Sequence, residues 1–385
     1  NLYNYCYRIG DLAVMIKVID EIDIYDNPKP QVHSRHGIFP GLVKLPSGEL
    51  VALFVQGEAF ESPNMTTMVS RSQDSGKSWQ LQGPLHDKFT GTDIETSDCF
   101  KATLLRDGRL VAVGYRFHRH DPEQGISIEE TGGVLPGDDI VSFSEDEGKT
   151  WTIPQIIPRS TPELQEISGP CVETQSGDLL AVAGIFNMPD GTNPSGQYGV
   201  LLRSKDKGKT WDDRSRFFEM SSGQVTAWES RICEMQAGRL VAITWAYDLS
   251  ANKHLPNYVV LSHDNGLSWS PPINTGHLAQ ASNLTWLRDD LLLTIHCHRE
   301  GDLGVCVRIV DVSKNQWKLL EEKFIWKASD VAATESGQII HEMFQSLRFG
   351  QPSLLHLQDE TFLAAYWTIE EGQGRIRSHR LEISI

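Results

Sequence analysis

Apolar stretches along this chain are short, and polar turns interrupt them at regular intervals. Six of these stretches share one pattern, in which an apolar strand, a short polar turn and a second apolar run follow one another. Segments of this length, bounded by Gly, Pro, Asp and Ser, predict pairs of antiparallel strands joined by tight turns. The six pairs cover residues 41–54, 100–114, 170–184, 230–245, 282–295 and 353–367. We therefore expect an all-β protein built from repeated strand pairs.

An eight-residue pattern, Ser-x-Asp-x-Gly-x-Ser/Thr-Trp, occurs four times between these pairs. The copies cover residues 72–79, 144–151, 204–211 and 262–269, and a fifth, degenerate copy keeps only its Trp317. In a β-hairpin turn the Asp can accept backbone N–H bonds, the Gly can take a positive φ, and the Trp can pack into the sheet. The pattern therefore predicts a structural turn rather than a catalytic aspartate.

The spacing of the strand pairs predicts the architecture. One equivalent apolar residue in each pair serves as a marker, and the markers are separated by 60, 69, 61, 51 and 71 residues. They are Leu50, Leu110, Leu179, Leu240, Leu291 and Phe362. Six units of this size, each with four short strands, predict a six-bladed β-propeller with four-stranded antiparallel blades. We expect residues 1–385 to form this single propeller, with the N-terminal segment 1–30 closing the ring, because residues 12–24 alternate like a strand.

The eight-residue pattern is the Asp-box (BNR repeat), and through it the chain resembles the sialidase (neuraminidase) superfamily of β-propellers. The resemblance extends over roughly residues 30–385. It implies a sialidase-like propeller, and it points to a glycosidase only in general terms, since propellers without enzymatic activity carry the same box.

Composition and charge narrow the range of partners. The chain has 385 residues and a net charge of −16, so it offers no basic surface for nucleic acid. No apolar run reaches the roughly 18 residues needed to span a membrane, and the first ten residues show no signal-peptide pattern.

The six cysteines form no CxxC pair, which predicts free thiols in a reducing, cytoplasmic compartment. No metal and no cofactor are expected.

Strand directions predict which face of the propeller carries a site. In an antiparallel blade, the turn after the first strand and the Asp-box turn lie on one face, so the innermost strands begin on the other face. Six residues stand at the equivalent position near the start of those strands and should ring a central pocket. They are Phe39, Cys99, Ser168, Glu229, Ala281 and Gln351. Glu229 is the only carboxylate among them.

The resemblance implies roles for two carboxylates. In sialidases the fourth blade begins with a dipeptide like Asn-Glu, whose Glu acts on the tyrosine nucleophile, and Glu229 matches that Glu. The family's general acid/base is an Asp in a first-blade loop, and Glu61 stands at the matching position with Glu58 as the second choice. A carboxylic acid beside Phe60 could have a raised pKa and donate a proton to a leaving oxygen.

The chain also departs from the sialidase pattern. Ile38 stands where the first arginine of the substrate-binding triad is expected, and the nearest arginine is Arg35. The position of the second arginine falls in the segment with Tyr247, while Arg299 matches the third. Gln351 replaces the tyrosine nucleophile, so the retaining route through a tyrosyl intermediate is not expected to operate.

Other side chains on the same face could rebuild a substrate site. Because side chains alternate along a strand, Arg116 and His118 should face one side and Arg119 the other. A guanidinium that grips a carboxylate in bidentate fashion suits an acidic sugar. The candidates for substrate binding are Arg35, Arg116, His118, Arg299, Gln351 and Tyr247.

Three functions remain open from the sequence. The first is an exo-acting glycoside hydrolase that removes a terminal, acidic sugar such as sialic acid, with Glu61 or Glu58 as acid and Glu229 as base or nucleophile. The second is a lyase or a hydrolase of a neutral sugar on the same fold, using Tyr247, His118 or Arg119. The third is a propeller that binds glycan or protein without catalysis. The sequence leaves the stereochemical outcome and the oligomeric state open.

Overall fold

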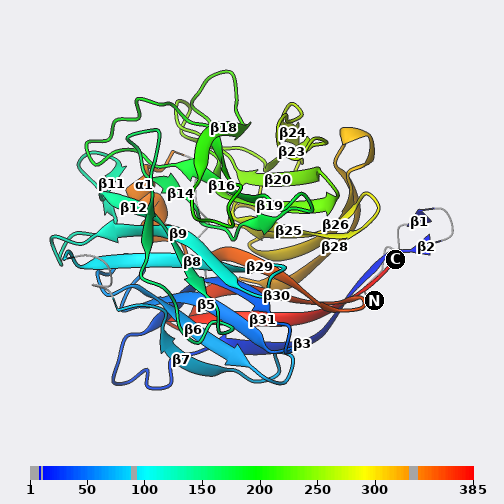
Figure 1. Cartoon of the computed structure of the whole chain (residues 1–385), viewed down its shortest axis with the longest axis horizontal. Helices are drawn as coiled ribbons and strands as arrows, with labels where there is room; N and C mark the ends of the chain where they lie inside the picture. Colours follow the sequence, from blue (N-terminus) through cyan, green and yellow to red (C-terminus); the bar gives the residue numbers. More distant parts are fainter. Residues whose placement is uncertain (1–7, 10–11, 88–92, 329–336) are drawn as a thin grey trace.

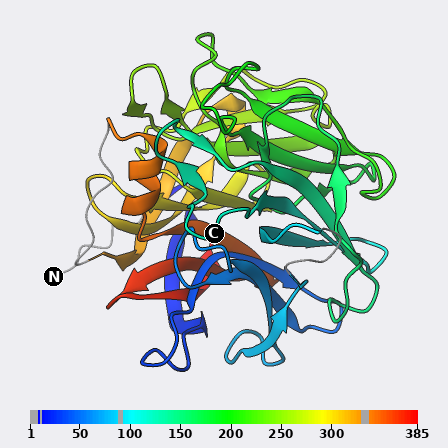
Figure 2. The ribbon, with the colours of Figure 1, turned by 90° about the vertical axis from the view of Figure 1, so that its left-hand side faces the viewer.

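The computed structural model describes residues 8–9, 12–87, 93–328 and 337–385. Six antiparallel sheets are arranged around a common centre, and the colours of the sequence follow one another round the ring in Figure 2. The fold is the six-bladed β-propeller with four-stranded blades that the spacing of the repeats predicts (Figure 1).

The first three blades follow one another along the chain, each with its innermost strand first. Blade 1 contains β4 (His36–Lys44), β5 (Leu50–Gly57), β6 (Thr66–Ser72) and β7 (Gln80–Pro84). Blade 2 contains β8 (Thr96–Leu104), β9 (Leu110–His118), β12 (Gly137–Ser144) and β13 (Gln155–Ile157). Blade 3 has a divided innermost strand, β14 (Gln165–Glu166) and β15 (Val172–Glu173), followed by β16 (Leu179–Ile185), β17 (Gly199–Ser204) and β18 (Asp212–Phe218).

The remaining blades repeat this order. Blade 4 contains β19 (Trp228–Gln236), β20 (Arg239–Trp245), β23 (Tyr258–Ser262) and β24 (Ile273–Asn274). Blade 5 contains β25 (Ser282–Arg288), β26 (Leu291–His298), β27 (Gly304–Asp311) and β28 (Lys318–Lys327). Blade 6 contains β29 (Phe349–Gln358), β30 (Thr361–Glu370), β31 (Gln373–Ser384) and, from the other end of the chain, β3 (Met15–Tyr25).

The two ends of the chain meet in blade 6. Strand β3 pairs antiparallel with β31 from Met15 opposite Ser384 to Tyr25 opposite Ile376. This pairing joins the first strand of the ring to the last, so the propeller is closed by backbone hydrogen bonds rather than by side-chain packing alone.

Smaller elements lie outside the six blade sheets. Three two-stranded sheets are formed by β1 (Arg8–Ile9) with β2 (Leu12–Ala13), β10 (Ser127–Ile128) with β11 (Gly133–Val134), and β21 (Tyr247–Asp248) with β22 (Lys253–His254). A 3-10 turn covers Ser313–Asn315, and the helix α1 covers Ile340–Ser346. No helix in the described part of the chain is long and apolar enough to cross a membrane.

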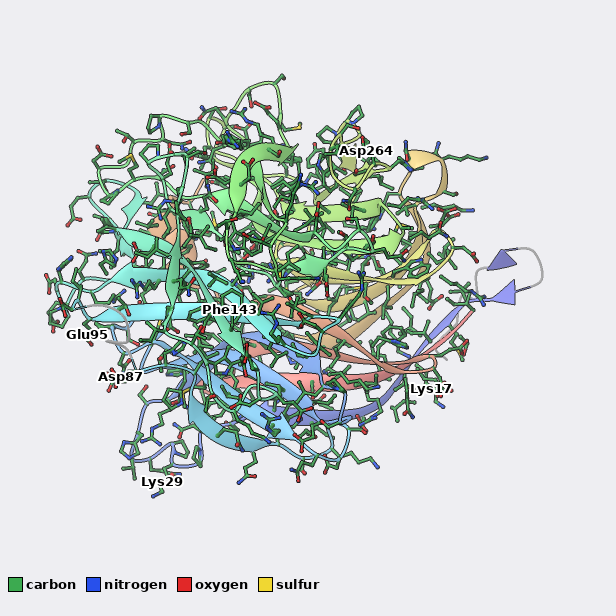
Figure 3. All side chains as sticks on the ribbon, viewed as in Figure 1. Lys17, Lys29, Asp87, Glu95, Phe143 and Asp264 are labelled. Atoms are coloured by element: carbon green, nitrogen blue, oxygen red, sulfur yellow. The ribbon has the colours of Figure 1, made fainter. Side chains whose placement is uncertain are left out.

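The four eight-residue repeats adopt the same turn. In the first, the Asp74 carboxylate accepts hydrogen bonds from the backbone N–H and the hydroxyl of Ser78, while Gly76 takes a φ of +86°. The Trp79 indole N–H donates to the Gly76 carbonyl. Equivalent bonds hold the other three turns. Asp264 of the fourth turn lies at the edge of the molecule in Figure 3, as a structural role predicts.

Candidate active site

A small cavity lies at the centre of the ring, where three innermost strands begin. Phe39, Glu229 and Gln351 occupy equivalent positions and all have a positive φ, of 57°, 45° and 35°. Each stands at a break in the register of its strand pair. A left-handed residue at such a bulge turns its side chain out of the regular alternation, and these three side chains line the cavity.

The cavity lining contains both polar and apolar side chains. Its volume is about 50 Å³. The polar lining comprises Glu166, Glu229, Gln351 and Tyr115, and the apolar lining comprises Phe39, Phe60, Phe117, Ile126, Phe186, Trp228, Trp245, Ile340, Phe344 and Leu347. Cys99, Ser168 and Ala281, which the sequence also placed around the pocket, are buried but are not among these residues.

Two buried glutamates, Glu166 and Glu229, line the cavity. Glu166 is 5% exposed and Glu229 is 6% exposed, and the Glu229 backbone N–H donates to Glu166 Oε2 at 3.0 Å. Burial, and then the negative charge of Glu229, raise the pKa of Glu166 well above its usual range. Both causes favour the protonated form of Glu166, because two neighbouring carboxylates would repel each other.

Buried cations lie around these carboxyls. Arg231 is 3% exposed, and its Nη1 donates to Ser168 Oγ at 3.0 Å and to the Ser230 carbonyl at 2.8 Å. Burial lowers the pKa of Arg231 and of Arg299, and the negative charge of Glu229 opposes that lowering in both. The two guanidinium groups therefore supply positive charge to Glu229 from inside the ring.

Three polar atoms in the cavity wall have no hydrogen-bond partner among the described residues. They are Glu229 Oε2, Gln351 Oε1 and the Trp228 indole N–H. Buried polar atoms are usually satisfied, so a group of unsatisfied atoms around one cavity indicates a place where a polar ligand would bind.

The two first-blade glutamates lie outside this cavity lining. The Glu61 Oε1 atom accepts bonds from the backbone N–H of Ser127 at 2.7 Å and from its hydroxyl at 2.8 Å, and the Glu61 carbonyl accepts one from Arg119. Glu58 is exposed; its carbonyl accepts a bond from the Ser34 hydroxyl, and its backbone N–H donates to Asn64 Oδ1. Phe60, between them, reaches the cavity.

The predicted substrate arginines are engaged elsewhere or lie at the surface. Arg116 Nε donates to Asp138 at 2.8 Å, and His118 Nε2 lies 2.9 Å from the same carboxylate. These two side chains hold the Asp138 carboxylate between neighbouring strands of blade 2. Arg35 is exposed, and its carbonyl accepts a bond from the Tyr25 hydroxyl.

Arg299 and Tyr247 are buried close to the centre. Arg299 is 2% exposed; its Nε donates to the Phe349 carbonyl and its Nη1 to Gln280, both at 2.8 Å. A side chain at Gly350 would collide with this guanidinium, since a Cβ there would lie 1.8 Å from it. The Tyr247 hydroxyl donates to the Gln338 carbonyl at 3.0 Å, in a second cavity.

Glu166 is the residue that reasoning from the sequence missed. Counting back from Leu179 gives Ser168, but the innermost strand of blade 3 is interrupted between β14 and β15. Gly169 there packs against Arg231, and Pro170 has no N–H to donate to a ladder. The interruption breaks the count, so that Glu166 rather than Ser168 faces the cavity. A carboxylate three residues before a Gly-Pro pair was the available signal.

Helix α1 covers the cavity. Its Ile340 and Phe344, together with Leu347 just beyond it, belong to the cavity wall. The Phe344 ring meets the Phe60 ring at a centroid distance of 5.9 Å. The volume of about 50 Å³ beneath this cover is far below the roughly 300–1,000 Å³ of ordinary small-molecule sites.

The described residues show no metal centre. No group of three or more His, Cys, Asp or Glu side chains in the described ranges is placed to hold a metal ion. Five of the cysteines, Cys99, Cys171, Cys233, Cys297 and Cys306, are free thiols. The sixth, Cys6, lies outside the described residues.

Comparisons with known proteins support the fold. No family model matches the chain, and no curated protein matches it in sequence. A crystal structure of a protein of unknown function from Dyadobacter fermentans is 22% identical, with a TM-score of 0.73 over 96% of this chain and 99% of that one. The Hadza microbial sialidase Hz136 is 16% identical, with a TM-score of 0.64 over 94% of this chain and 68% of that one. A Penicillium chrysogenum α-L-arabinanase complexed with arabinobiose is 14% identical, with a TM-score of 0.65 over 95% and 98%.

These structures place the chain among sialidase-like six-bladed propellers in fold. Its neighbours in structure include glycoside hydrolases of two kinds, sialidases and an arabinanase.

Proposed function

We propose that the protein is a glycoside hydrolase whose reaction centre is the carboxyl pair Glu166 and Glu229. The observation that carries this proposal is the placement of two buried carboxyls against one central cavity, with the pKa of Glu166 raised by burial and then by the charge of Glu229. Glycoside hydrolysis needs such a pair, because one group must protonate the leaving oxygen while the other supplies a negative charge.

The environments of the two groups support a different role for each. Glu166 keeps its proton and serves as the general acid for the glycosidic oxygen. Glu229 acts as the nucleophile or as the base that activates water, and the buried charges of Arg231 and Arg299 stabilise its carboxylate. This chemistry needs no tyrosine, which agrees with Gln351 at the usual nucleophile position. Glu61 remains the alternative acid that the resemblance to sialidases predicts.

The side chains around this cavity suit a neutral sugar better than an acidic one. An acidic sugar needs a guanidinium available to its carboxylate, whereas Arg116 is bound to Asp138 and Arg299 to the Phe349 carbonyl. The arabinanase among the neighbours in structure supports a neutral sugar as the substrate. Because sialidases are also among these neighbours, an acidic sugar is the alternative substrate. For either sugar to reach the carboxyls, the Phe344 side chain of α1 must move away from the cavity.

The proposal is tested by a panel of aryl glycosides of neutral sugars, uronic acids and sialic acid. We expect turnover of a neutral glycoside and a loss of at least about 100-fold in kcat for Glu166→Gln and for Glu229→Gln, the range for a missing acid or base. Glu173→Gln is the matched control. The Glu173 side chain is buried in blade 3, the blade of Glu166, but it pairs with Lys207 and does not line the cavity. Full turnover in both cavity variants would refute the assignment.

A further inference from the structure

A second cavity adjoins the central one and has the size of a ligand site. Its volume is about 420 Å³, within the range of small-molecule sites. It lies between the loops of blades 2, 3 and 4 and the segment that leads into α1. Trp228 and Ile340 line both cavities, so a ligand in the second cavity would lie next to a sugar in the first.

The lining combines aromatic rings with uncharged amides. Trp228 and Tyr247 stack at a centroid distance of 5.7 Å and an interplanar angle of 16°. The amide side chains of Asn187, Asn193, Gln224, Asn252 and Gln338 are the main polar groups around them. None of the lining residues, all of which lie in the described ranges, carries a charge. In a chain with a net charge of −16, this is a locally neutral surface.

Two polar atoms of this lining lack partners. The Trp228 indole N–H and Gln338 Oε1 make no hydrogen bond with any described residue, although both atoms are buried. Trp228 as a whole is 6% exposed. Both residues line this cavity, and a ligand there that both accepts and donates hydrogen bonds would satisfy these two atoms once their side chains shift.

A neutral sugar is chemically complementary to this lining. Its hydroxyls both donate and accept, which matches amides that do the same, and its apolar ring face packs on an aromatic side chain. An anionic ligand would find no cation here. We propose that this cavity binds the neutral oligosaccharide that continues beyond the cleaved bond. That role rests on the proposed function, whereas the binding of a neutral oligosaccharide does not.

Binding is measured by calorimetry with arabinotriose, xylotriose, cellotriose and galactotriose, their monosaccharides, and trigalacturonic acid and sialyllactose as acidic controls. Glu229→Gln is the background, so that no ligand is consumed. Gln224→Trp fills the cavity from an exposed position, and Gln82→Trp places the same ring on the exposed strand β7. Gln224→Leu, a smaller change, removes the amide without filling the space, and circular dichroism checks that each variant is folded.

We expect at least one neutral trisaccharide to bind ten-fold or more tightly than its monosaccharide. Gln224→Trp should weaken that binding at least ten-fold, Gln224→Leu less, and Gln82→Trp not at all. The inference is overturned if no neutral trisaccharide binds more tightly than its monosaccharide, if the acidic ligands bind best, or if Gln224→Trp leaves the affinity unchanged.

Turnover by the protein without the Glu229→Gln change separates this inference from the proposed function. Trisaccharide binding that Gln224→Trp abolishes, without any hydrolysis, would support the second cavity and refute the glycosidase. Hydrolysis of aryl glycosides, with trisaccharide binding unaffected by Gln224→Trp, would support the glycosidase and refute the second cavity.

Discussion

Replacing Arg299 by Met is expected to destabilise the propeller, because this arginine connects two blades at the centre of the ring. Arg299 directly follows β26 in blade 5. Its guanidinium donates to the Phe349 carbonyl at the start of β29 in blade 6 and to Gln280. Hydrogen bonds from a charged group contribute about 1.5–3 kcal/mol each. Loss of the bonds to these two acceptors therefore costs ~3–6 kcal/mol.

The expected cost converts into a measurable change in melting temperature. With an unfolding entropy of about 2.1 cal/mol/K per residue, a chain of 385 residues should lose about 4–7 °C in Tm, measured by scanning calorimetry. Arg299→Lys keeps the charge but not the planar guanidinium, so its Tm should lie between those of Arg299→Met and the unmodified protein. Arg288→Met is the matched control, since Arg288 is exposed and donates to the terminal Ile385 carbonyl. An Arg299→Met variant that melts within 1 °C of the unmodified protein would refute the reasoning.

Three further predictions concern Asp74 in the first eight-residue turn, Phe344 in the cover of the cavity, and Glu61. The Ser78 hydroxyl and N–H hold the pKa of Asp74 at about 2 against 3.8, so Asp74 stabilises the fold above pH ~4 and loses that effect as the pH falls towards 2. Asp74→Asn should therefore lower Tm at pH 7 and match the unmodified protein near pH 2. Phe344→Ala should enlarge the central cavity and lower KM for aryl glycosides, and an unchanged KM would count against α1 as the cover. Glu61→Gln should keep kcat within about ten-fold, whereas a loss as large as that of Glu166→Gln would make Glu61 the acid.

The architecture was predictable because its signals are local and repeated. Each eight-residue turn depends on bonds between residues at most four apart, such as Ser78 to Asp74, so the residues that form it are visible in the sequence. The position of Glu229 was also predictable, since the register break at this position recurs in the innermost strand pairs of blades 1, 4 and 6, so that counting reaches equivalent residues. The same counting found Phe39 and Gln351, which share its backbone conformation.

The rest of the site depends on contacts between distant segments. Glu166 enters the cavity because the innermost strand of blade 3 is interrupted, which shifts the register that counting assumes. Arg116 and Arg299 look like free cations in the sequence, yet Asp138 and the Phe349 carbonyl engage them in the fold. Neither the partner of an arginine nor the cover formed by α1 can be read from residue spacing.

The central claim, that Glu166 protonates a leaving group beside Glu229, is tested most directly by comparing two leaving groups. The kcat/KM of Glu166→Gln is measured on the 2,4-dinitrophenyl and the 4-methoxyphenyl glycoside of the preferred neutral sugar. A good leaving group needs no proton, so we predict a loss within about ten-fold for the first and of about 10²–10⁴-fold for the second. Equal losses on both glycosides, or no loss on either, would contradict the account.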